Sequence, residues 1–539
     1  MSSNIIKEET KVSPEDPLIF LEKENANNFD FLSLPPLIEK SVSFQLSVKV
    51  KTRIYKASVW ILTFICYTAF HLSRKSLSVV KSTLRDNCND SEFNITYIES
   101  NTTCNHGWAP FNTQQGVTLL GVLDYSFLLT YAIAMFFSGA ISDRSNLRCF
   151  LAFGTFASGG FMLLLGLAYF SRIHSIIYFI IVQIGNGIFQ SMGHTGVFSA
   201  NNHWFGKSKR GLILGIWNIH TPFGNILGSV IPGIWAGSDW GWSFFVPGFI
   251  MIIVAVLIFL FLVSDPSDVG LPQPKHHAVS FENTTAPPKA IGFCRALLIP
   301  GVVEYSACLF FNKLVSYTFL FWLPYFIRFS IQMNGSYLSA ELSAFLSVTF
   351  DIGGIFGGIF AGFISDIFQS RSVICGVMLY SSIPSLFMYY RFGNTGIVAN
   401  TVLQFVFGFM INGPYSLITT AISADLGTHE SLKNSVNAKG TVVAIIDGIG
   451  SLGAATGPLL TGLLLNNLGY DWVIYLLISS CALAALVISR LIIIDLMRLC
   501  SSLKRISSQT LFHKMNLEKD PESDENFLQP ERLHLDKEM

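Results

Sequence analysis

Residues 67–75 read YTAFHLSRK, and they lie within an apolar segment that opens at Ala57 and continues through Val80. The part of this segment before Arg74 is shorter than the roughly 20 residues that a membrane-spanning helix needs. A spanning helix must therefore carry the adjacent cations Arg74 and Lys75 inside it. A cation near the centre of a bilayer costs about 2.5 kcal/mol or more, so such residues normally face a bundle interior or a water-filled cavity.

Three polar side chains share one face of this predicted helix. Tyr67, His71 and Arg74 follow one another at spacings of four and three residues, which places them in line on a helix. Arginine presents a rigid fork of donors that fits a carboxylate or a phosphate, and Lys75 adds a point charge beside it. The pattern predicts an oxyanion site inside the membrane. In the alternative, Arg74 and Lys75 mark the far interface and extend to lipid headgroups.

The composition is that of a polytopic membrane protein. Of the 539 residues, 51% are hydrophobic and 13% are charged, whereas soluble domains carry roughly 25% charged residues. The formal net charge is zero, so we expect the lipid bilayer and no nucleic acid as a partner. The nine cysteines show no CxxC or Cys/His spacing, and we therefore expect no metal and no cofactor. No cleavable signal peptide is expected either.

Twelve apolar segments predict an all-α membrane fold. In the first half of the chain they lie near residues 57–80, 117–138, 149–170, 174–200, 212–235 and 242–264, and in the second half near 301–327, 338–363, 373–390, 396–422, 439–466 and 471–495. We expect a disordered cytosolic tail at 1–50, a six-helix half at 51–264, a cytosolic linker at 265–297, a second six-helix half at 298–495 and a cytosolic tail at 496–539.

The loops indicate which side of the membrane each end faces. Basic residues at positions 49–56 precede the first span and place the N-terminus in the cytosol by the positive-inside rule. Glycosylation sequons follow the first and seventh spans, on the opposite side, at Asn89, Asn94, Asn101 and Asn334. Cys88 and Cys104 share the first of these loops and form a disulfide if that loop faces an oxidising compartment.

A short motif recurs after the second and eighth spans. Gly139, Asp143 and Arg148 are matched at identical spacing by Gly362, Asp366 and Arg371. This repeat predicts two six-helix halves in parallel, the plan of major facilitator transporters, with a substrate site between the halves at the midplane. We expect the glycines to allow close helix approach, and each Asp–Arg pair to bridge a cytosolic turn and hold one gate state. In the alternative, these are two ordinary turns.

The second half should supply a further cation, because one Arg-Lys pair does not enclose a dianion. Lys313 in the seventh span is the candidate, unless it extends to the inner interface. His220 in the fifth span is able to donate to phosphate, or else forms a hydrogen bond between helices. Asp124, Asp351 and Asp447 are intramembrane carboxylates that balance the cations or carry protons.

At these residues the chain resembles the sugar-phosphate exchangers, the organophosphate:phosphate antiporters of the major facilitator superfamily, and among them the animal branch related to the glucose-6-phosphate transporter. The matching stretches are FHLSRK (70–75), LDYSFLLTYAIAMFFSGAISD (123–143), NHWFGKSKRGLILGIWNIHTPFGNILGS (202–229), KLVSYTFLFWLP (313–324), DIGGIFGGIFAGFISD (351–366), AISADLGTHESLK (421–433) and IIDGIGSLGAATGPLLTGLL (445–464). The resemblance implies exchange of a phosphate ester for inorganic phosphate by alternating access, typically across the endoplasmic reticulum membrane.

The resemblance also assigns roles to individual residues. It makes Arg74 the phosphate-binding arginine of the first span, Lys75 its neighbour, Tyr67 an aromatic site residue and His220 approximately the site histidine of the fifth span. The better-known antiporters carry their second-half cation at the position of Ser316, one helical turn after Lys313.

Two other functions remain open from the sequence alone. The first keeps the fold but transports a carboxylate-bearing organic anion with proton coupling through Asp124 or Asp447. The second is a membrane enzyme or a non-transporting subunit. Ser, His and Asp occur singly on different spans, so no catalytic constellation supports an enzyme.

Overall fold

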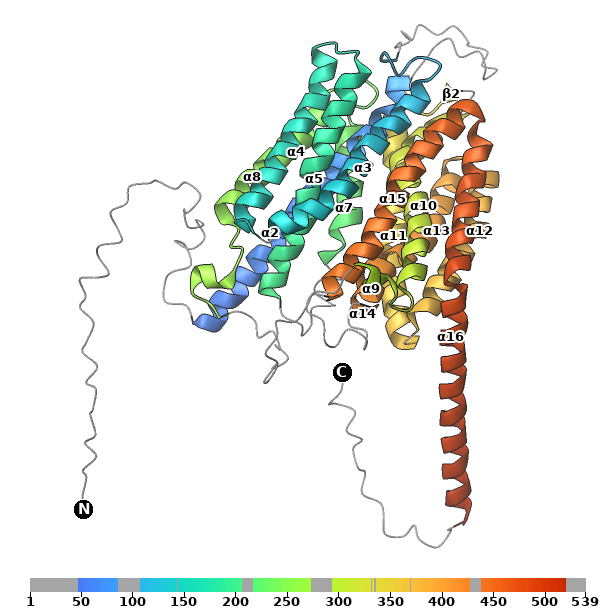
Figure 1. Ribbon diagram of the computed structural model, residues 1–539. Coiled ribbons are helices and arrows are strands. Elements are labelled where there is room, and N and C mark those ends of the chain that lie inside the picture. Colours follow the sequence, from blue (N-terminus) through green and yellow to red (C-terminus); the bar gives the residue numbers. More distant parts are fainter. Residues whose placement is uncertain are drawn as a thin grey trace, which may run out of the picture.

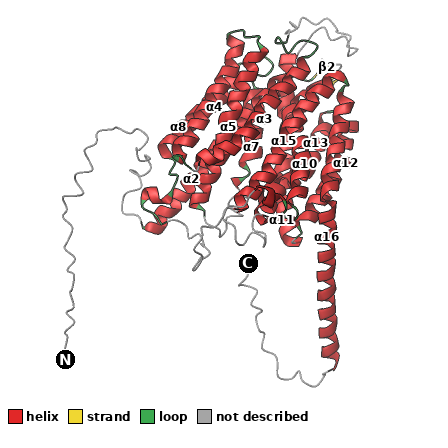
Figure 2. Cartoon of the chain, viewed as in Figure 1, coloured by secondary structure: helices red, strands yellow, loops and turns green. Residues whose placement is uncertain are grey.

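The computed structural model describes residues 47–85, 107–142, 144–205, 217–272, 293–330, 332–333, 336–368, 370–426 and 438–519. This part of the chain is helical apart from loops and one short hairpin, in which β1 (Gln332–Met333) pairs with β2 (Ser336–Tyr337) (Figure 2). The fold is therefore the all-α fold that the apolar segments predict.

Six long helices form each half of the bundle (Figure 1). The first half contains α2 (Val48–Arg85), α3 (Gly116–Ser142), α4 (Leu147–Phe170), α5 (Ile176–Trp204), α7 (His220–Gly233) and α8 (Trp242–Phe261). The second half contains α10 (Val302–Ser330), α11 (Ala340–Phe368), α12 (Arg371–Phe392), α13 (Ile397–Leu417), α15 (Ala438–Asn467) and α16 (Tyr470–Lys519). Short elements connect them: η2 (Pro266–Val269), α9 (Phe293–Leu297), the π-helical turn η3 (Ile418–Ile422) and α14 (Ser423–Leu426).

Ten of these helices are long and apolar enough to span a membrane by themselves. The other two are α2, which holds the cations, and α7, of which 14 residues form the described helix. Helix α16 runs to Lys519, beyond the predicted end of the last span at residue 495, and projects from the bundle (Figure 1).

Helix α2 lies at the centre of the bundle, and the outer helices separate it from lipid. Every residue of α2 from Cys66 to Ser82 is buried. By contrast, large apolar side chains on the outer helices are exposed, among them Phe153 of α4, Ile253 of α8 and Leu486 of α16. Exposed apolar side chains are favourable where lipid surrounds the protein, so this pattern fits a membrane-embedded bundle.

The two halves meet through α2 with α10, α7 with α11, and α3 with α15. Hydrogen bonds between the halves join α2 to α10 at Lys75, Ser78, Lys81, Ser82 and Thr83, and join α7 to α11 at Asn225 and Ser229. The residues of α2 lie in its C-terminal part, and Asn225 and Ser229 lie in the middle and the C-terminal part of α7. We call this end of the bundle, opposite the N-terminal start of α2, the closed end.

The glycines of the repeated motif do not bring helices together, and our expectation for them is wrong. A Cβ added to Gly139 or Gly362 would meet nothing within 4 Å. Close approach occurs at other glycines instead. A Cβ on Gly353 of α11 would lie 2.2 Å from a backbone carbonyl oxygen of α13, and one on Gly453 of α15 would lie 2.0 Å from a carbonyl oxygen of α10.

The expected Asp–Arg pair across the turn is also wrong in the second half. Arg371 forms an ion pair with Asp425 of α14, because Asp366 lies on the exposed side of the last turn of α11. In the first half Asp143 is outside the described residues, and Arg148 is buried.

Candidate functional site

Arg74 points into the bundle, so the headgroup alternative does not fit. Its side chain is 5% exposed, its Nε donates to Gln190 Oε1 of α5 at 2.6 Å, and its guanidinium carbon lies 4.5 Å from the centroid of the Tyr131 ring of α3. Gln190 is oriented in turn, because its Nε2 donates to Ser73 Oγ at 2.9 Å. Within the described chain Arg74 Nη2 is buried without a hydrogen-bond partner, which leaves a charged donor available to an anion.

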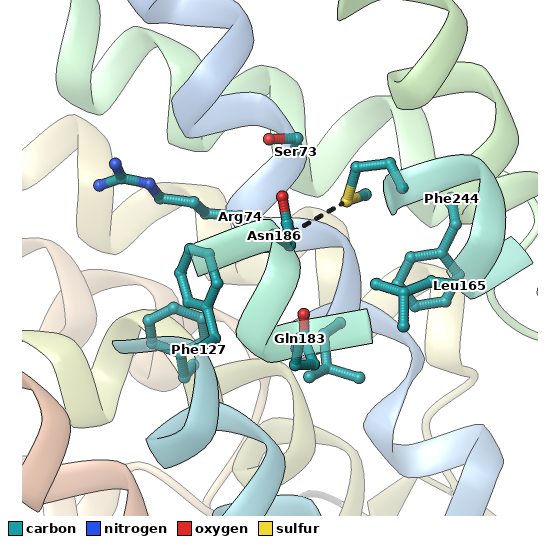
Figure 3. Close-up of a pocket in the computed structure, with 10 residues that line it drawn as sticks. Ser73, Arg74, Phe127, Leu165, Gln183, Asn186 and Phe244 are labelled. Carbon is teal, nitrogen blue, oxygen red and sulfur yellow. Dashed lines mark hydrogen bonds between the residues drawn. The ribbon is translucent and has the colours of Figure 1, made fainter. Parts of the chain in front are cut away.

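A small cavity lies beside the stem of Arg74 (Figure 3). It has room for about one water molecule, so it does not hold a phosphate ester. The guanidinium extends away from the Leu165 and Phe244 side of this cavity (Figure 3). The lining residues are Ser73, Arg74, Leu77, Phe127, Met162, Leu165, Gln183, Asn186, Phe244 and Phe321.

Rings from three helices surround Tyr67, which lies one helical turn before His71 in α2. The Tyr67 ring packs edge-on against His71 at 5.0 Å and against His220 of α7 at 4.5 Å, and it lies 5.8 Å from the His194 ring of α5. His220 Nδ1 contacts Thr221 Oγ1 at 3.0 Å, while its Nε2 is buried without a partner among the described residues. The structure therefore brings the predicted site residues Tyr67, His71 and His220 together.

His71 connects this ring cluster to the other half. Its Nδ1 lies 3.3 Å from Asn225 Oδ1, and Asn225 Nδ2 donates to Asp351 Oδ1 of α11 at 3.0 Å. Because the Asn225 amide donates to Asp351 through its nitrogen, its oxygen accepts the proton of His71 Nδ1. Nε2 of His71, which faces Thr221 Oγ1 at 3.4 Å, is then an acceptor.

Lys75 does not lie with Arg74, because adjacent residues on a helix point about 100° apart. Its fully buried ammonium donates to the backbone carbonyl of Leu320 at 2.7 Å and lies 3.9 Å from Asp351 Oδ2. These groups belong to α10 and α11. The predicted convergence of Arg74, Lys75 and Lys313 on one phosphate is thus not the arrangement that the structure has, and substrate binding by Lys75 stays a prediction.

Lys313 lies in the interior, and an acid faces it. Its Nζ donates to Asp447 Oδ1 of α15 at 2.8 Å and to Ser451 Oγ at 3.3 Å. The snorkelling alternative does not fit, because the side chain is 3% exposed. Gly450 leaves room for this side chain, since a Cβ there would lie 3.1 Å from Lys313 Cδ. Asp447 also lies close enough to Arg74 and His194 to interact electrostatically with both.

The arrangement is suited to holding an anion between the halves. Arg74 and Lys313 come from α2 and α10, which the repeat predicts to be equivalent helices. No group of His, Cys, Asp and Glu residues in the described chain could hold a metal ion. Hydroxyl, amide and imidazole groups line the same region, so a polar organic anion would find hydrogen-bond partners there.

Sequence reasoning missed two functional candidates. Gln190, which orients Arg74, has no sequence pattern that would distinguish it from other amides buried between helices. Lys81 was missed because the apolar segment ends at Val80, although its position seven residues after Arg74 puts it on the same helix face.

The described chain does not include Cys88, Cys104 or the sequons at Asn89, Asn94, Asn101 and Asn334, so these predictions are outside it.

Two six-helix halves around an interior polar site are the plan of major facilitator transporters, and the sequence agrees. Residues 63–433 match the Major Facilitator Superfamily, and the chain belongs to this superfamily. It is a transporter and not an enzyme.

The relatives identify the branch. The chain is 45% identical over 482 residues to the glucose-6-phosphate exchanger SLC37A2 of Bos taurus, covering 84% of this chain and 96% of the relative. The Homo sapiens SLC37A2 is 45% identical over 480 residues, covering 84% and 95%. A putative glycerol-3-phosphate transporter 1 of Arabidopsis thaliana is 43% identical over 469 residues, covering 83% and 90%. The predicted membership in the animal sugar-phosphate exchanger branch is thereby confirmed.

A solved structure agrees with the fold. The bacterial homologue of the human lysosomal transporter Spinster, in an inward-facing and unoccupied conformation, superposes with a TM-score of 0.59 at 16% identity, covering 82% of this chain and 97% of that one. At this identity the likeness supports the fold alone.

Proposed function

We propose that this protein exchanges a phosphate ester, of the glucose 6-phosphate or glycerol 3-phosphate class, for inorganic phosphate by alternating access. One observation carries the proposal. Four cations of α2 and α10 are at most 5% exposed, namely Arg74, Lys75, Lys81 and Lys313. Three of them have a carboxylate within 4 Å, whereas Arg74 has none in the described chain. An interior guanidinium without an adjacent carboxylate is costly in a membrane, and a phosphate would supply an adjacent counter-ion.

The geometry suggests how the phosphate is held. Gln190 fixes Nε of Arg74, so Nη2 and its neighbouring donors keep one direction and form charge-assisted hydrogen bonds with phosphate oxygens. Lys313 faces the site from the other half, and its contact with Asp447 competes with the phosphate. Binding that draws Arg74 and Lys313 toward one anion would pull the two halves together on the site side and drive the conformational change.

The same charge balance favours exchange over uniport. When the site is empty, return of the carrier would bury the guanidinium of Arg74 without a counter-ion. With phosphate bound, the charge is compensated and the return is less costly. The organic part of the substrate would lie toward Tyr67, His71 and His220, where His220 Nε2 has no partner in the described chain. This assignment of the substrate-binding residues rests on their positions around Arg74.

The Lys313–Asp447 ion pair counts against proton-coupled transport of a carboxylate-bearing anion through Asp447. That alternative uses Asp124 or Asp447 as a proton carrier, yet each forms an ion pair with a lysine. At the partly exposed Asp447, the adjacent ammonium favours the ionised carboxylate. We place the protein in the endoplasmic reticulum membrane with both termini in the cytosol, on the basis of the charge and sequon pattern and the branch resemblance.

Reconstituted proteoliposomes test the proposal. Vesicles preloaded with phosphate should take up labelled phosphate or glucose 6-phosphate, and unloaded vesicles should not. Arg74→Ala should abolish this uptake, whereas Arg391→Ala, which removes an exposed cation at the end of α12, should leave it unchanged. Uptake that requires a pH gradient and no internal phosphate would instead support the proton-coupled alternative.

A further inference from the structure

Lys81, near the end of α2, is a buried cation that the phosphate site does not use. Its ammonium forms an ion pair with Asp124 of α3. It also donates to the backbone carbonyl of Phe321 at 3.0 Å and lies 4.1 Å from the centroid of the Trp322 ring. Both Lys81 and Asp124 are fully buried. Asp124 belongs to the same half as Lys81, whereas Phe321 and Trp322 belong to α10 of the other half.

A proline explains why α10 offers the Leu320 carbonyl as an acceptor here. Pro324 has no N–H, so the carbonyl of Leu320 lacks the usual helical partner four residues later. Lys75 Nζ and Ser78 Oγ donate to this carbonyl at 2.7 and 3.0 Å. Lys81 reaches the next carbonyl along the chain. The proline thus interrupts the α10 ladder at the point where α2 crosses it.

Separating Lys81 from α10 would cost less free energy than separating it from Asp124. If α10 moved away, the ion pair with Asp124 would remain within the first half, and no uncompensated charge would be left in the interior. Lys81 would give up one charge-assisted hydrogen bond, to Phe321, and its position over the Trp322 ring. Lys81 can therefore leave α10 and return to it, while a cation without its own carboxylate could not.

Two further atoms are consistent with a contact that tightens and loosens. Asp124 Oδ1 and Trp322 Nε1 are both buried without a hydrogen-bond partner in the described part of the chain. The indole lies close enough to the carboxylate to act as its donor. A static core pair would normally satisfy both groups.

We propose that Lys81, anchored by Asp124, is a releasable lock at the closed end. It binds the Phe321 carbonyl and the Trp322 ring when this end is shut, and it releases them when the halves separate. This inference goes beyond phosphate exchange, because it concerns the orientation that the carrier adopts at rest. Its test therefore does not depend on any substrate.

Two serines provide a reporter for opening of this end. Ser229 Oγ of α7 and Ser347 Oγ of α11 lie 3.4 Å apart across the two halves, and both side chains are fully buried. A cysteine introduced as Ser347→Cys should react with a water-soluble maleimide only when the halves separate. The protein with its native cysteines and Ser347 intact gives the background rate, which is subtracted.

The lock predicts that Trp322→Leu in the Ser347→Cys protein speeds labelling about thirtyfold, the ratio expected for loss of a desolvated cation–π contact. Trp322→Phe keeps an aromatic ring and should have a smaller effect. The matched control is Trp472→Leu, which makes the same change at an exposed position of α16 and should have none. All variants are labelled without phosphate or sugar phosphate.

A second variant covers the case in which Trp322→Leu fails to fold. Lys81→Gln combined with Asp124→Asn replaces the ion pair by an uncharged amide pair and should also speed labelling. The native thiol of Cys308, fully buried in α10, reports unfolding, because its reaction would rise only if the bundle came apart. Unchanged labelling of Ser347→Cys in both variants, with Cys308 still protected, would overturn the lock. Failure of phosphate exchange in liposomes would leave this result unaffected.

Discussion

Gln190→Glu separates a substrate-binding Arg74 from a structural one. The new carboxylate would receive the hydrogen bond that Arg74 Nε now donates to Gln190 at 2.6 Å, and it would give Arg74 the adjacent carboxylate that it lacks in the described part of the chain. If Arg74 only joined α2 to α5, this ion pair would be neutral or favourable for the protein. If Arg74 binds phosphate, the new carboxylate competes with the substrate.

The size of the effect follows from the geometry. We consider a phosphate bound on the side of the guanidinium that faces away from position 190. Two hydrogen-bond lengths and the width of the guanidinium then separate it from the new carboxylate, a distance of about 7 Å. Two unit charges at that separation repel by about 2.4 kcal/mol at an effective dielectric constant of about 20. The apparent affinity for phosphate should therefore fall about 50-fold.

The assay is homologous phosphate exchange in proteoliposomes, with KM measured for Gln190→Glu, Gln190→Met and the unchanged protein. Gln190→Met removes the hydrogen bond without adding charge and should raise KM by about tenfold, as expected when one hydrogen bond to a charged group is removed. The thermal midpoint of Gln190→Glu should stay at or above that of Gln190→Met. An unchanged KM in Gln190→Glu would refute the phosphate-binding role of Arg74.

Two further predictions concern the packing that supports the site. Lys313→Met should abolish exchange and destabilise the protein by about 1–3 kcal/mol. This is less than the loss expected for a fully buried ion pair, because the Asp447 side chain is 24% exposed. Adding Asp447→Leu should recover much of the loss in thermal midpoint without restoring exchange. Gly453→Val should abolish the monodisperse peak of the protein in size-exclusion chromatography, because a Cβ at this position would lie 2.0 Å from a carbonyl oxygen of α10. The control Gly139→Ala should leave the peak intact, because a Cβ there would meet nothing within 4 Å.

The positions of the helices are predictable because lipid imposes a long apolar run on each span. The sequence predicts the fourth span at 174–200, and α5 occupies Ile176–Trp204; it predicts the sixth at 242–264, and α8 occupies Trp242–Phe261. The run gives no information on where a helix continues in water. Helix α16 therefore extends to Lys519 without any signal at residue 495.

Helical spacing by itself predicts the site only within one helix. Spacing along α2 correctly groups Tyr67 with His71, since both are set by the helical period. The same period argues against grouping Lys75 with Arg74, because one residue turns the helix by about 100°. The partners of Lys75 and Lys81 come from α3, α10 and α11, and contacts between helices depend on packing that a single sequence pattern does not contain.

The placement of both functions on α2 has a mechanical consequence. Arg74 and Lys81 lie seven residues apart on one helix face, a separation of about 10.5 Å along the axis. The run of buried helix between them moves as one body, and Ser78 contacts α10 midway between the two positions. If the halves rock about that contact, a motion that brings Arg74 toward Lys313 carries Lys81 away from Phe321 and Trp322. An anion that draws Arg74 and Lys313 together on the site side would thereby release the closed end, with no separate element needed to transmit the signal.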